Sequence, residues 1–407
     1  MSGLVFHSAG ESHGPQLTGI LEGLPAGMTV DFARINADLA ERQRGFGRGG
    51  RMTVESDRCV ITAGVRHGVT LGSPIAFYIT NKDWDNWQAV MSVTDVESAP
   101  SSEHEADLLR PRTVPRPGHA DLAGAQKYDF ADLRNVLERA SARETAVRVA
   151  AGAFARMLLS EFGVGMAAHV VRIGGAAMPA KAWTVEEVRA GVAGSDVRCL
   201  DPEVSEAMRA EIRAAAAAGN TVGGVVEVVA SGLVPGLGDY VQWDRRLDGL
   251  LAQALMSVPS VKGVEIGDGF AQTSHRGSEV HDEIHHDRAN TTRQSGFYRL
   301  TNRAGGLEGG VTNGADLVVR AATKPLPTLN QPLGSVDIHT KEATRAFVER
   351  SDICSVPAAA VVCEAMVALV LADAYLQAFG GGALSDIRDR FAAYVSRLDQ
   401  FGAAKAP

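Results

Sequence analysis

The sequence predicts a fold that mixes α-helices with β-strands. Residues 16–22 alternate between apolar and polar side chains, as a half-buried strand does, whereas residues 31–43 space their apolar side chains as an amphipathic helix does. Residues 223–229 are rich in β-branched valine, which favours a strand. The glycine-rich turn at residues 231–239 lacks the spacing of a dinucleotide-binding fingerprint, so a Rossmann fold is not indicated.

The first third of the chain is predicted to contain several strands and one helix. Asp31 is a natural N-cap for the helix at residues 31–43, because its carboxylate can accept a hydrogen bond from the first turn. Residues 92–107 are acidic and rich in turn residues, and we expect them to form a solvated excursion. Strands are predicted at residues 4–6, 16–22, 52–62 and 75–79.

The remainder of the chain continues this mixture. A helical pattern runs from Leu133 to about Phe162, and its small residues would let another backbone or a flat ligand pack closely. The longest apolar run, at about residues 356–370, is interrupted by Cys363 and Glu364, which indicates a buried helix rather than a membrane span. This helix is predicted at residues 357–379. Strands are predicted at residues 166–173, 223–229, 261–266 and 316–322, and shorter helices at 185–193, 203–218 and 244–257.

The composition is that of an ordinary soluble globular protein. The chain has 407 residues, 45% hydrophobic and 22% charged, enough for one large domain or two to three average ones. The formal net charge of -8 argues against a protein that coats nucleic acid. No signal segment precedes the first strand, so we expect a cytoplasmic location. The four cysteines show no short paired spacing, so neither a zinc site nor a disulfide framework is predicted, and we expect reduced core residues. They are Cys59, Cys199, Cys354 and Cys363.

Residues 10–14, Gly-Glu-Ser-His-Gly, are the first candidate for chemistry. Glycines on both sides of Ser12 and His13 allow a sharp turn and close approach to a ligand, and histidine gains or loses a proton near neutral pH. The segment is therefore either an acid-base site or a surface turn after the first strand. The Ser-His pair alone does not decide between the two.

Residues 42–51 form a loop with four arginines, four glycines and no acid. Because the segment cannot neutralise its own charge, its guanidinium groups and backbone amides could bind a small polyanion. The alternative is a flexible, solvated arm. We favour the anion-binding loop because the segment is short and lies between a helix pattern and a strand pattern.

Two further basic segments point to anions. Residues 110–121 are a proline-stiffened loop that carries His119 beside a glycine and among arginines, so this histidine either caps the loop or acts on an anionic ligand. Arg139 and Arg143 lie four residues apart on one face of the long helical pattern. No nearby acid is placed to neutralise both, which again favours an anion site.

The last candidate segments lie in the second half of the chain. Glycine-dense residues 305–314 precede a strand and Lys-Pro-Leu-Pro-Thr at residues 324–328 follows it, an arrangement similar to a phosphate cradle. Asp352 beside Arg350 is either a helix cap or a paired catalytic acid. The histidines of residues 281–287 suggest a metal site, but no helical pattern surrounds them, so a hydrophilic loop is the better interpretation.

Three segments resemble the signature segments of the chorismate synthase family. They are residues 10–14, residues 139–145 (Arg-Ala-Ser-Ala-Arg-Glu-Thr), and residues 350–352 (Arg-Ser-Asp) with residues 364–366 (Glu-Ala-Met). The segments Gly-Phe-Gly-Arg-Gly, Arg-Pro-Gly-His-Ala-Asp, Val-Lys-Gly-Val-Glu and Gly-Gly-Val-Thr-Asn-Gly also resemble that family, so the similarity covers nearly the whole chain. It implies a single α+β domain over residues 1–407, a β-α-β sandwich specific to the family, assembled as a homotetramer.

The resemblance implies a lyase of the shikimate route to the aromatic amino acids. In this family, 5-enolpyruvylshikimate-3-phosphate loses phosphate and a ring hydrogen by 1,4-anti elimination to give chorismate. Reduced FMN is required although there is no net redox change. Arginine loops suit a substrate with one phosphate and two carboxylates. The resemblance leaves open whether the chain reduces its own FMN with NADPH or depends on a separate flavin reductase.

The resemblance also implies roles for individual residues. His13 would assist departure of the phosphate with support from Ser12, and His119 would protonate or stabilise the reduced flavin. Asp352 would help move the substrate proton through the flavin. Substrate would be bound by Arg42, Arg48, Arg51 and Arg143. FMN would be bound by Arg139, Ala140, Ser141, Ser260, Gly309, Lys324, Pro325, Leu326, Pro327, Thr328 and Arg350.

Three features depart from the commonest family pattern. Ala140 stands where serine is usual and Ser260 where alanine is usual, so hydroxyl contacts there would be rearranged. If these positions contact FMN through the backbone, little is lost. The histidine-rich residues 281–286 have no counterpart in the pattern, which weakens a functional interpretation of them.

Two functions from other classes remain as alternatives. An NADPH-dependent flavin oxidoreductase would share the FMN cradle but leave the phosphate ester intact. A polyanion-binding protein would use the arginine loop to bind RNA in a salt-sensitive manner. The net charge and the histidines weigh against the second, and we expect neither nucleic acid nor a membrane as a partner.

Overall fold

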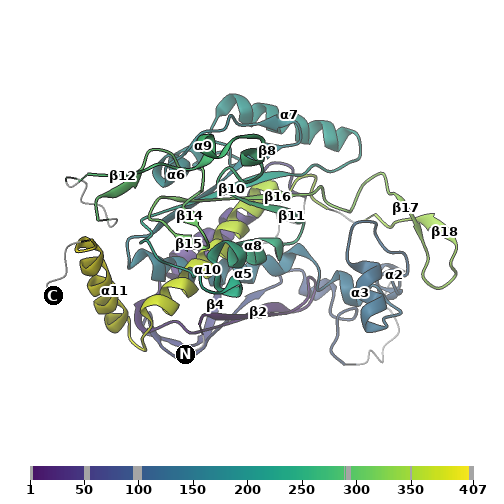
Figure 1. The fold of residues 1–407 in the computed structure, drawn as a ribbon. Helices are drawn as coiled ribbons and strands as arrows, with labels where there is room; N and C mark the ends of the chain where they lie inside the picture. The colour runs from purple at the N-terminus through teal and green to yellow at the C-terminus, as the bar shows by residue number, and fades with distance from the viewer. Residues whose placement is uncertain are drawn as a thin grey trace.

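The fold is a sandwich in which two antiparallel β-sheets enclose a layer of helices (Figure 1). The computed structural model describes residues 3–49, 56–94, 103–287, 289, 295–348 and 351–402. The first sheet has the order β1 (Val5–Ala9), β2 (Gln16–Glu22), β7 (Ile75–Thr80) and β4 (Val60–Ala63). The second has the order β11 (Val261–Ile266), β16 (Leu317–Thr323), β10 (Gly224–Ser231), β8 (Gly165–Ile173) and β9 (Ala176–Ala177).

The middle layer is built around α5 (Thr145–Ser160) and α10 (Val356–Phe379), with α1 (Phe32–Gln43) and α8 (Leu247–Met256) packed beside them. A Cβ atom at Gly152 would lie 2.4 Å from the Ala365 Cβ, so only glycine allows α5 and α10 to approach this closely. The small residues of α5 therefore accommodate another backbone. Among the described helices, α10 alone is long and apolar enough to cross a membrane, and 83% of its most apolar window is buried in the fold.

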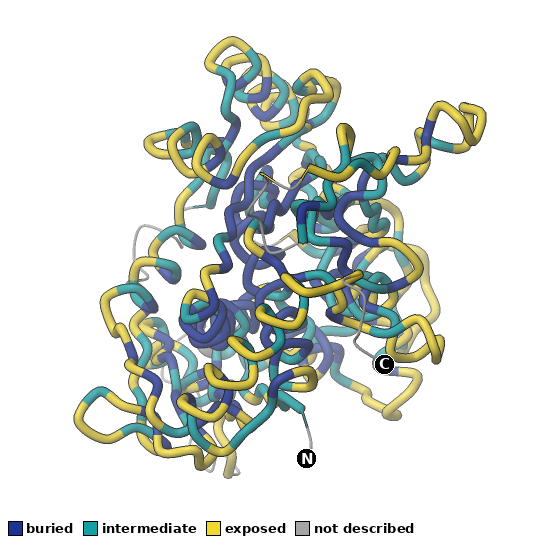
Figure 2. The backbone as a smooth tube through the Cα atoms, turned by 60° about the vertical axis from the view of Figure 1, so that its left-hand side comes forward, coloured by how far each residue is buried: buried dark blue, intermediate teal, exposed yellow. Residues whose placement is uncertain are grey.

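Helices α6 (Val185–Val192) and α7 (Pro202–Ala217) cover the outer face of the second sheet, at the top of Figure 1. Each begins at a side-chain cap: Thr184 and Glu187 form a capping box for α6, and Asp201 accepts two backbone N–H groups of α7. The buried segments gather at the centre of the molecule and the exposed loops surround them (Figure 2).

A lobe beside the sandwich, at the right of Figure 1, carries the proline-stiffened loop at residues 110–121. It contains α2 (Glu103–Leu109), α3 (Asp121–Tyr128), α4 (Arg134–Leu137) and the hairpin of β17 (Gly334–Val336) and β18 (Ala343–Arg345). The Ile338 N–H donates to the Thr113 carbonyl at 2.9 Å, and the Ser335 hydroxyl donates to the Pro115 carbonyl at 2.6 Å. The hairpin therefore braces the loop that holds His119.

The remaining elements are short or peripheral. A small sheet has the order β3-β6-β5, two hairpins pair β12 with β13 and β14 with β15, and α11 packs against the end of α10. Their bounds are β3 (Ala26–Thr29), β5 (Val65–Arg66), β6 (Val69–Leu71), α9 (Gly277–Val280), β12 (Ile284–His286), β13 (Phe297–Arg299), β14 (Leu307–Glu308), β15 (Val311–Thr312) and α11 (Leu384–Asp399).

The predicted α+β class and β-α-β sandwich are confirmed, and β2 and β11 have the predicted bounds. The predicted helix from Leu133 to Phe162 is wrong, because Ser141 interrupts it. The Ser141 backbone is extended and its hydroxyl accepts from the Arg143 N–H, so it caps a new 3₁₀ turn, η3 (Ala142–Glu144). Part of the predicted strand at residues 52–62 lies outside the described residues; β4 begins at Val60.

Two predicted loops also contain regular structure. Residues 103–109, rich in glutamate, alanine and leucine, form α2 within the expected solvated excursion, since these residue types favour helix. The expected hydrophilic loop at residues 281–287 contains strand β12, paired with β13. The extent of a single domain over residues 1–407 stays a prediction.

Candidate active site

His13 lies in the loop between β1 and β2, where a buried carboxylate holds it. Its Nδ1 lies 2.8 Å from Oε1 and 3.0 Å from Oε2 of Glu138, and its backbone N–H donates to Oε2 at 2.8 Å. The imidazole stacks on the Trp87 indole with ring centroids 3.8 Å apart and planes 20° apart. The His13 side chain is 18% exposed and that of Glu138 only 1%, so the ring reaches solvent while its anchor does not.

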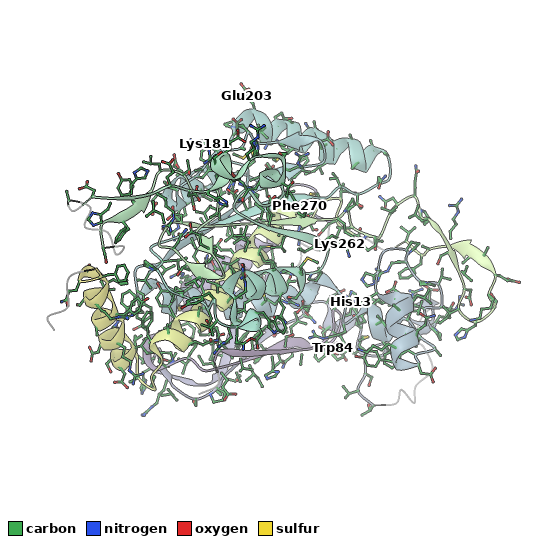
Figure 3. All side chains as sticks on the ribbon, in the orientation of Figure 1. His13, Trp84, Lys181, Glu203, Lys262 and Phe270 are labelled. Carbon is green, nitrogen blue, oxygen red and sulfur yellow. The ribbon has the colours of Figure 1, made fainter. Side chains whose placement is uncertain are left out.

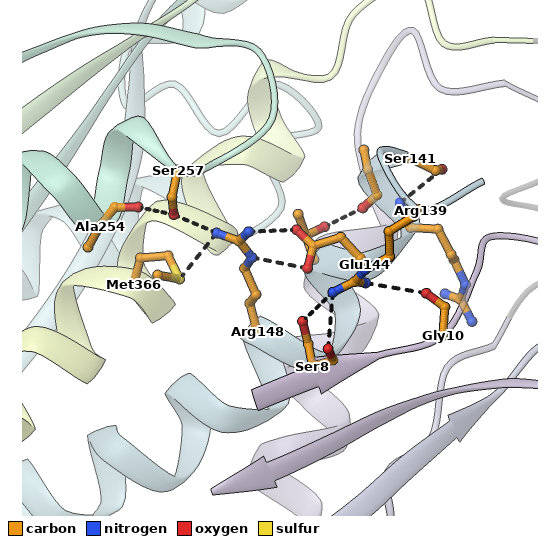
Figure 4. Close-up of polar contacts among 12 residues, drawn as sticks. Ser8, Gly10, Arg139, Ser141, Glu144, Arg148, Ala254, Ser257 and Met366 are labelled. Atoms are coloured by element: carbon orange, nitrogen blue, oxygen red, sulfur yellow. Dashed lines mark hydrogen bonds and ion pairs between the residues drawn. The ribbon is translucent and has the colours of Figure 1, made fainter. Parts of the chain in front are cut away.

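The segment after Glu138 lines the same loop. The buried Ser12 accepts a hydrogen bond from the Ser141 hydroxyl at 3.1 Å. The Arg139 guanidinium donates to the hydroxyl and carbonyl of Ser8 and to the Gly10 carbonyl (Figure 4). The fold therefore brings together Ser12, His13, Arg139 and Ser141, as the family resemblance implies.

The substrate arginines Arg42 and Arg143 converge on Asp57. Arg143 Nη1 lies 2.7 and 2.6 Å from the two carboxylate oxygens, and Arg42 Nη1 lies 3.6 Å from one of them. All three side chains are at most 5% exposed. The Asn81 side chain connects this cluster to the His13 loop, because it accepts from Arg143 Nε at 2.9 Å and donates to the Gly14 carbonyl at 2.6 Å.

Of Arg139 and Arg143, which were expected to lack acids that neutralise both, Arg143 is paired with Asp57, whereas Arg139 donates to Ser8 and Gly10. Asp57 is distant in sequence from Arg143, so the local pattern could not reveal the pair. The expectation that Arg139 and Arg143 share one helix face is wrong, because Arg139 lies in the turn before η3 and Arg143 within it. Two guanidinium groups on one carboxylate still leave the cluster cationic by one charge.

Arg48 and Asp352 meet from opposite ends of the chain. Arg48 Nη1 lies 2.7 Å from Asp352 Oδ2, and the Gly49 N–H donates to Asp352 Oδ1 at 2.7 Å. A Cβ atom on Gly49 would lie 3.2 Å from the Ser351 carbonyl oxygen, so glycine allows the close approach. The Asp352 carboxylate is thus held by the arginine loop, not by a helix end. Arg51 and Arg350 lie outside the described residues.

His119 has its own buried carboxylate partner. Its Nδ1 lies 2.5 Å from Asp121 Oδ1, and Arg116 donates to Asp121 Oδ2 at 2.9 Å and to the Thr328 hydroxyl at 3.2 Å. Burial would raise the pKa of Asp121, but the hydrogen bonds from His119 and Arg116 outweigh it and hold that pKa well below its usual range. Asp121 is therefore an ionised anchor for both side chains.

The predicted phosphate cradle lies next to His119. The Lys324 ammonium donates to the Gly118 carbonyl, and the Lys324 N–H donates to the Ser260 carbonyl at 2.9 Å. Burial and the neighbouring charge of Lys262 lower the pKa of Lys324. Figure 3 shows Lys262 on the side of the sandwich that faces the lobe, as it shows His13.

The other cradle residues follow the turn after β16. Thr328 is buried, and its carbonyl accepts from the Ser351 hydroxyl at 3.2 Å, which connects the cradle to Asp352. The Leu326 carbonyl accepts from the Thr221 hydroxyl at 2.7 Å. Pro325 is exposed, and Pro327 lies beside Gly118. The fold thus assembles residues 324–328 with His119 and Asp352.

Arg148 connects the segment after Ser141 to the turn that follows α8. Its guanidinium lies 2.8 Å from Glu144 and donates to the Ser257 hydroxyl at 2.7 Å (Figure 4). Ser257 follows α8 and leads to Ser260, whose backbone has a φ of 69° and whose hydroxyl donates to the Pro259 carbonyl. The extra hydroxyl of Ser260 is therefore used within its own turn.

Gly309 and Ser260 lie near opposite ends of α8. Gly309 is the residue near the start of the helix. It lies in the turn between β14 and β15, where the neighbouring Gly310 carbonyl accepts from Leu247 at the start of α8. Ser260 follows the other end of this ten-residue helix, about 15 Å away at 1.5 Å per residue. Ala140 lies in the turn before Ser141, where its N–H donates to the Val136 carbonyl.

The histidine-rich residues 281–287 do not form the helical pair that a metal site would need. His285 and His286 are neighbours on strand β12, so their side chains point to opposite faces. His286 contacts the Phe297 ring edge-on, and His285 stacks near Tyr298. Within the described part of the chain, no group of three or more His, Cys, Asp or Glu side chains could hold a metal ion.

Sequence reasoning did not identify four residues that shape the site: Trp87, Asp57, Asp121 and Glu138. Asp121 ends the segment Arg-Pro-Gly-His-Ala-Asp, and Glu138 directly precedes the segment at residues 139–145, so an acid within or beside a candidate segment was an available signal. Asp57 and Trp87 carry no local signal. Their contacts join segments that are distant in sequence.

Comparison with known proteins agrees with the family resemblance. The family profile described as chorismate synthase matches residues 4–376. The chorismate synthase of Geobacter sulfurreducens is 53% identical over 400 residues, which cover 98% of this chain and 100% of the relative. That of Moorella thermoacetica is 55% identical over 398 residues, with the same coverage.

A solved structure supports the same assignment. A crystal structure of chorismate synthase superimposes with a TM-score of 0.78 at 40% sequence identity, and the match covers 98% of this chain and 100% of that chain. The profile, the relatives and the fold thus agree over nearly the full length. The chain belongs to the chorismate synthase family.

Proposed function

We propose that this chain converts 5-enolpyruvylshikimate-3-phosphate to chorismate and phosphate, the last step of the shikimate route, with reduced FMN and no net redox change. One observation carries the proposal: His13 and His119 each have Nδ1 engaged by a buried carboxylate, and arginine side chains lie near both histidines. An imidazole anchored at one nitrogen is suited to exchange a proton at the other.

The arginines supply sites for the anionic groups of this substrate. The net positive cluster of Arg42, Arg143 and Asp57 suits a phosphate or carboxylate, because guanidinium groups bind both through paired hydrogen bonds. In the elimination the C–O bond to phosphate breaks, a ring C–H bond loses its proton, and a new double bond forms. His13 would donate a proton to the leaving phosphate.

The residues around Lys324 fit a flavin mononucleotide. Two neighbouring ammonium groups, Lys324 and Lys262, and the Thr328 hydroxyl suit a phosphate. When bound, reduced FMN would supply electron density to the substrate as its phosphate leaves. His119 would hold a proton at its Nε2 beside this cradle.

Asp352 would take part in moving the ring proton. Its carboxylate is 21% exposed and accepts hydrogen bonds from the arginine loop, so Arg48 keeps it oriented while one side stays accessible. Because Arg48 is also a proposed substrate ligand, binding of an anionic substrate would change the charge that faces Asp352. Substrate binding and proton movement would therefore be coupled.

We further propose a homotetrameric, cytoplasmic enzyme that receives reduced FMN either from its own NADPH-dependent reduction or from a separate flavin reductase. Sedimentation of the purified protein measures the first property. Anaerobic mixing of the protein, FMN and NADPH, with flavin absorbance followed over time, separates the two sources of reducing equivalents.

The activity is tested anaerobically with 5-enolpyruvylshikimate-3-phosphate and chemically reduced FMN, without any reductase. We expect phosphate and chorismate to be released together, with no release when FMN is omitted or oxidised. Folded protein that releases neither product contradicts the proposal. NADPH oxidation with the phosphate ester left intact would favour the flavin oxidoreductase instead.

A further inference from the structure

We infer that Glu138 is a positioning residue that fixes the orientation and the tautomer of His13. The inference rests on the proposed function, since His13 is the proposed proton donor to the leaving phosphate. Glu138 itself would touch neither substrate nor flavin. Its effect on the reaction would pass through the imidazole that it holds.

The geometry shows how Glu138 acts on His13. Both carboxylate oxygens lie within 3.0 Å of Nδ1, and Oε2 also accepts from the His13 backbone N–H at 2.8 Å. A single carboxylate thus holds the main chain and the ring of the same residue. Because an ionised carboxylate can only accept, Nδ1 must carry the hydrogen, and proton exchange with a ligand falls to Nε2.

Neighbouring contacts restrict the ring further. The Trp87 indole stacks against the imidazole, and the Arg134 guanidinium lies 5.6 Å from the Trp87 ring centroid, at cation-π distance. The Glu138 carbonyl accepts from the Ser12 N–H at 3.1 Å, so the residue before His13 is held by the same anchor. Rotation of the ring would break the carboxylate contact and the stacking together.

The structure offers a matched control for this pair. Glu227 on β10 is also a buried carboxylate, 3% exposed, and its Oε1 lies 2.9 Å from Nε2 of the buried His169 on β8. It has the same histidine-carboxylate chemistry, but it lies within the second sheet. Glu227→Gln should therefore lower stability without changing turnover.

The test is a double-mutant cycle between Glu138→Gln and His13→Ala, assayed as phosphate release with chemically reduced FMN. Glutamine keeps the size of the side chain, but its amide nitrogen cannot accept from the two N–H groups of His13. We expect Glu138→Gln to lower kcat at least about tenfold and to change KM less than about threefold, because it misdirects a general acid worth about 10²–10⁴ in rate. In the His13→Ala background, we expect Glu138→Gln to lower kcat further by less than about twofold.

Two results would overturn the inference. One is a wild-type kcat for Glu138→Gln; the other is an equal loss of kcat in both backgrounds, which would mean that Glu138 acts independently of His13. A second measurement does not depend on folding of the Glu138→Gln variant. In protein labelled with ¹⁵N-histidine, with the His13 signals assigned by their loss in His13→Ala, we expect the hydrogen on Nδ1; a neutral ring protonated only at Nε2 refutes the inference.

The ¹⁵N measurement also separates this inference from the proposed function. It needs neither substrate nor flavin. An inactive wild-type protein that carries the hydrogen on His13 Nδ1 would reject the proposed reaction but keep the positioning role. An active protein with the other tautomer would do the reverse.

Discussion

Replacement of Asp57 by asparagine should destabilise the protein strongly, because this carboxylate is the ion-pair partner of two buried guanidinium groups. Arg143 contacts both of its oxygens, at 2.7 and 2.6 Å, and Arg42 approaches one at 3.6 Å. Removal of one partner of a buried ion pair costs about 3–5 kcal/mol. Both arginines keep neutral acceptors, the Thr145 hydroxyl for Arg42 and the Asn81 side-chain amide oxygen for Arg143, so we expect about 3 kcal/mol, the lower end of that range.

This loss is measurable against a total stability of about 5–15 kcal/mol. Urea unfolding of the wild type and Asp57→Asn, followed by fluorescence and circular dichroism at one protein concentration, gives the difference in unfolding free energy. The control is Asp196→Asn, which removes the ion pair between Asp196 and Arg209. Because the Asp196 side chain is 46% exposed, we expect this change to lower the unfolding free energy by less than about 1 kcal/mol. A loss below about 1 kcal/mol for Asp57→Asn would refute the view that Asp57 holds the arginine cluster.

Further predictions concern the two histidines, the anchor of His119 and the phosphate cradle. His13→Ala and His119→Ala should each lower turnover at least about tenfold while FMN still binds, and a near wild-type rate removes that histidine from the mechanism. Asp121 has a folded-state pKa below its unfolded value near 3.9, so its stabilising effect is full above about pH 4 and is lost as the pH falls further. The difference in unfolding free energy between wild type and Asp121→Asn should therefore be smaller at pH 3 than at pH 7, and a constant difference contradicts the ionised anchor. Lys324→Ala should weaken FMN binding at least about tenfold by fluorescence titration, and unchanged affinity would place the FMN phosphate elsewhere.

Elements with a strong local pattern were predictable. The alternation of residues 16–22 gives β2, and Asp31 caps α1 by accepting from the Arg34 N–H, because both effects act within one segment. The break before α5 was not, since the same residues also fit a continuous helix. The Ser141 hydroxyl favours a break over a continuous helix, because it caps η3 and also donates to Ser12.

The site was predictable in its residue types but not in its pairings. The family resemblance points to His13, His119 and Asp352 as site residues. Hydrogen bonds of Thr328 connect the segments of His119 and Asp352, and Asn81 connects the His13 loop to Arg143. Asp121 lies two residues from His119, but the pairs His13–Glu138 and Arg143–Asp57 could not be predicted, because their members lie far apart along the chain. An arginine loop with no acid of its own is neutralised by acids that the fold supplies.

The most direct test of the central claim is one anaerobic turnover with enzyme, chemically reduced FMN and 5-enolpyruvylshikimate-3-phosphate in equal amounts. Phosphate, chorismate and the flavin spectrum are followed in the same sample. The account predicts equal amounts of phosphate and chorismate, with the flavin still reduced at the end. Flavin oxidised in proportion to product, or phosphate released without chorismate, would contradict it.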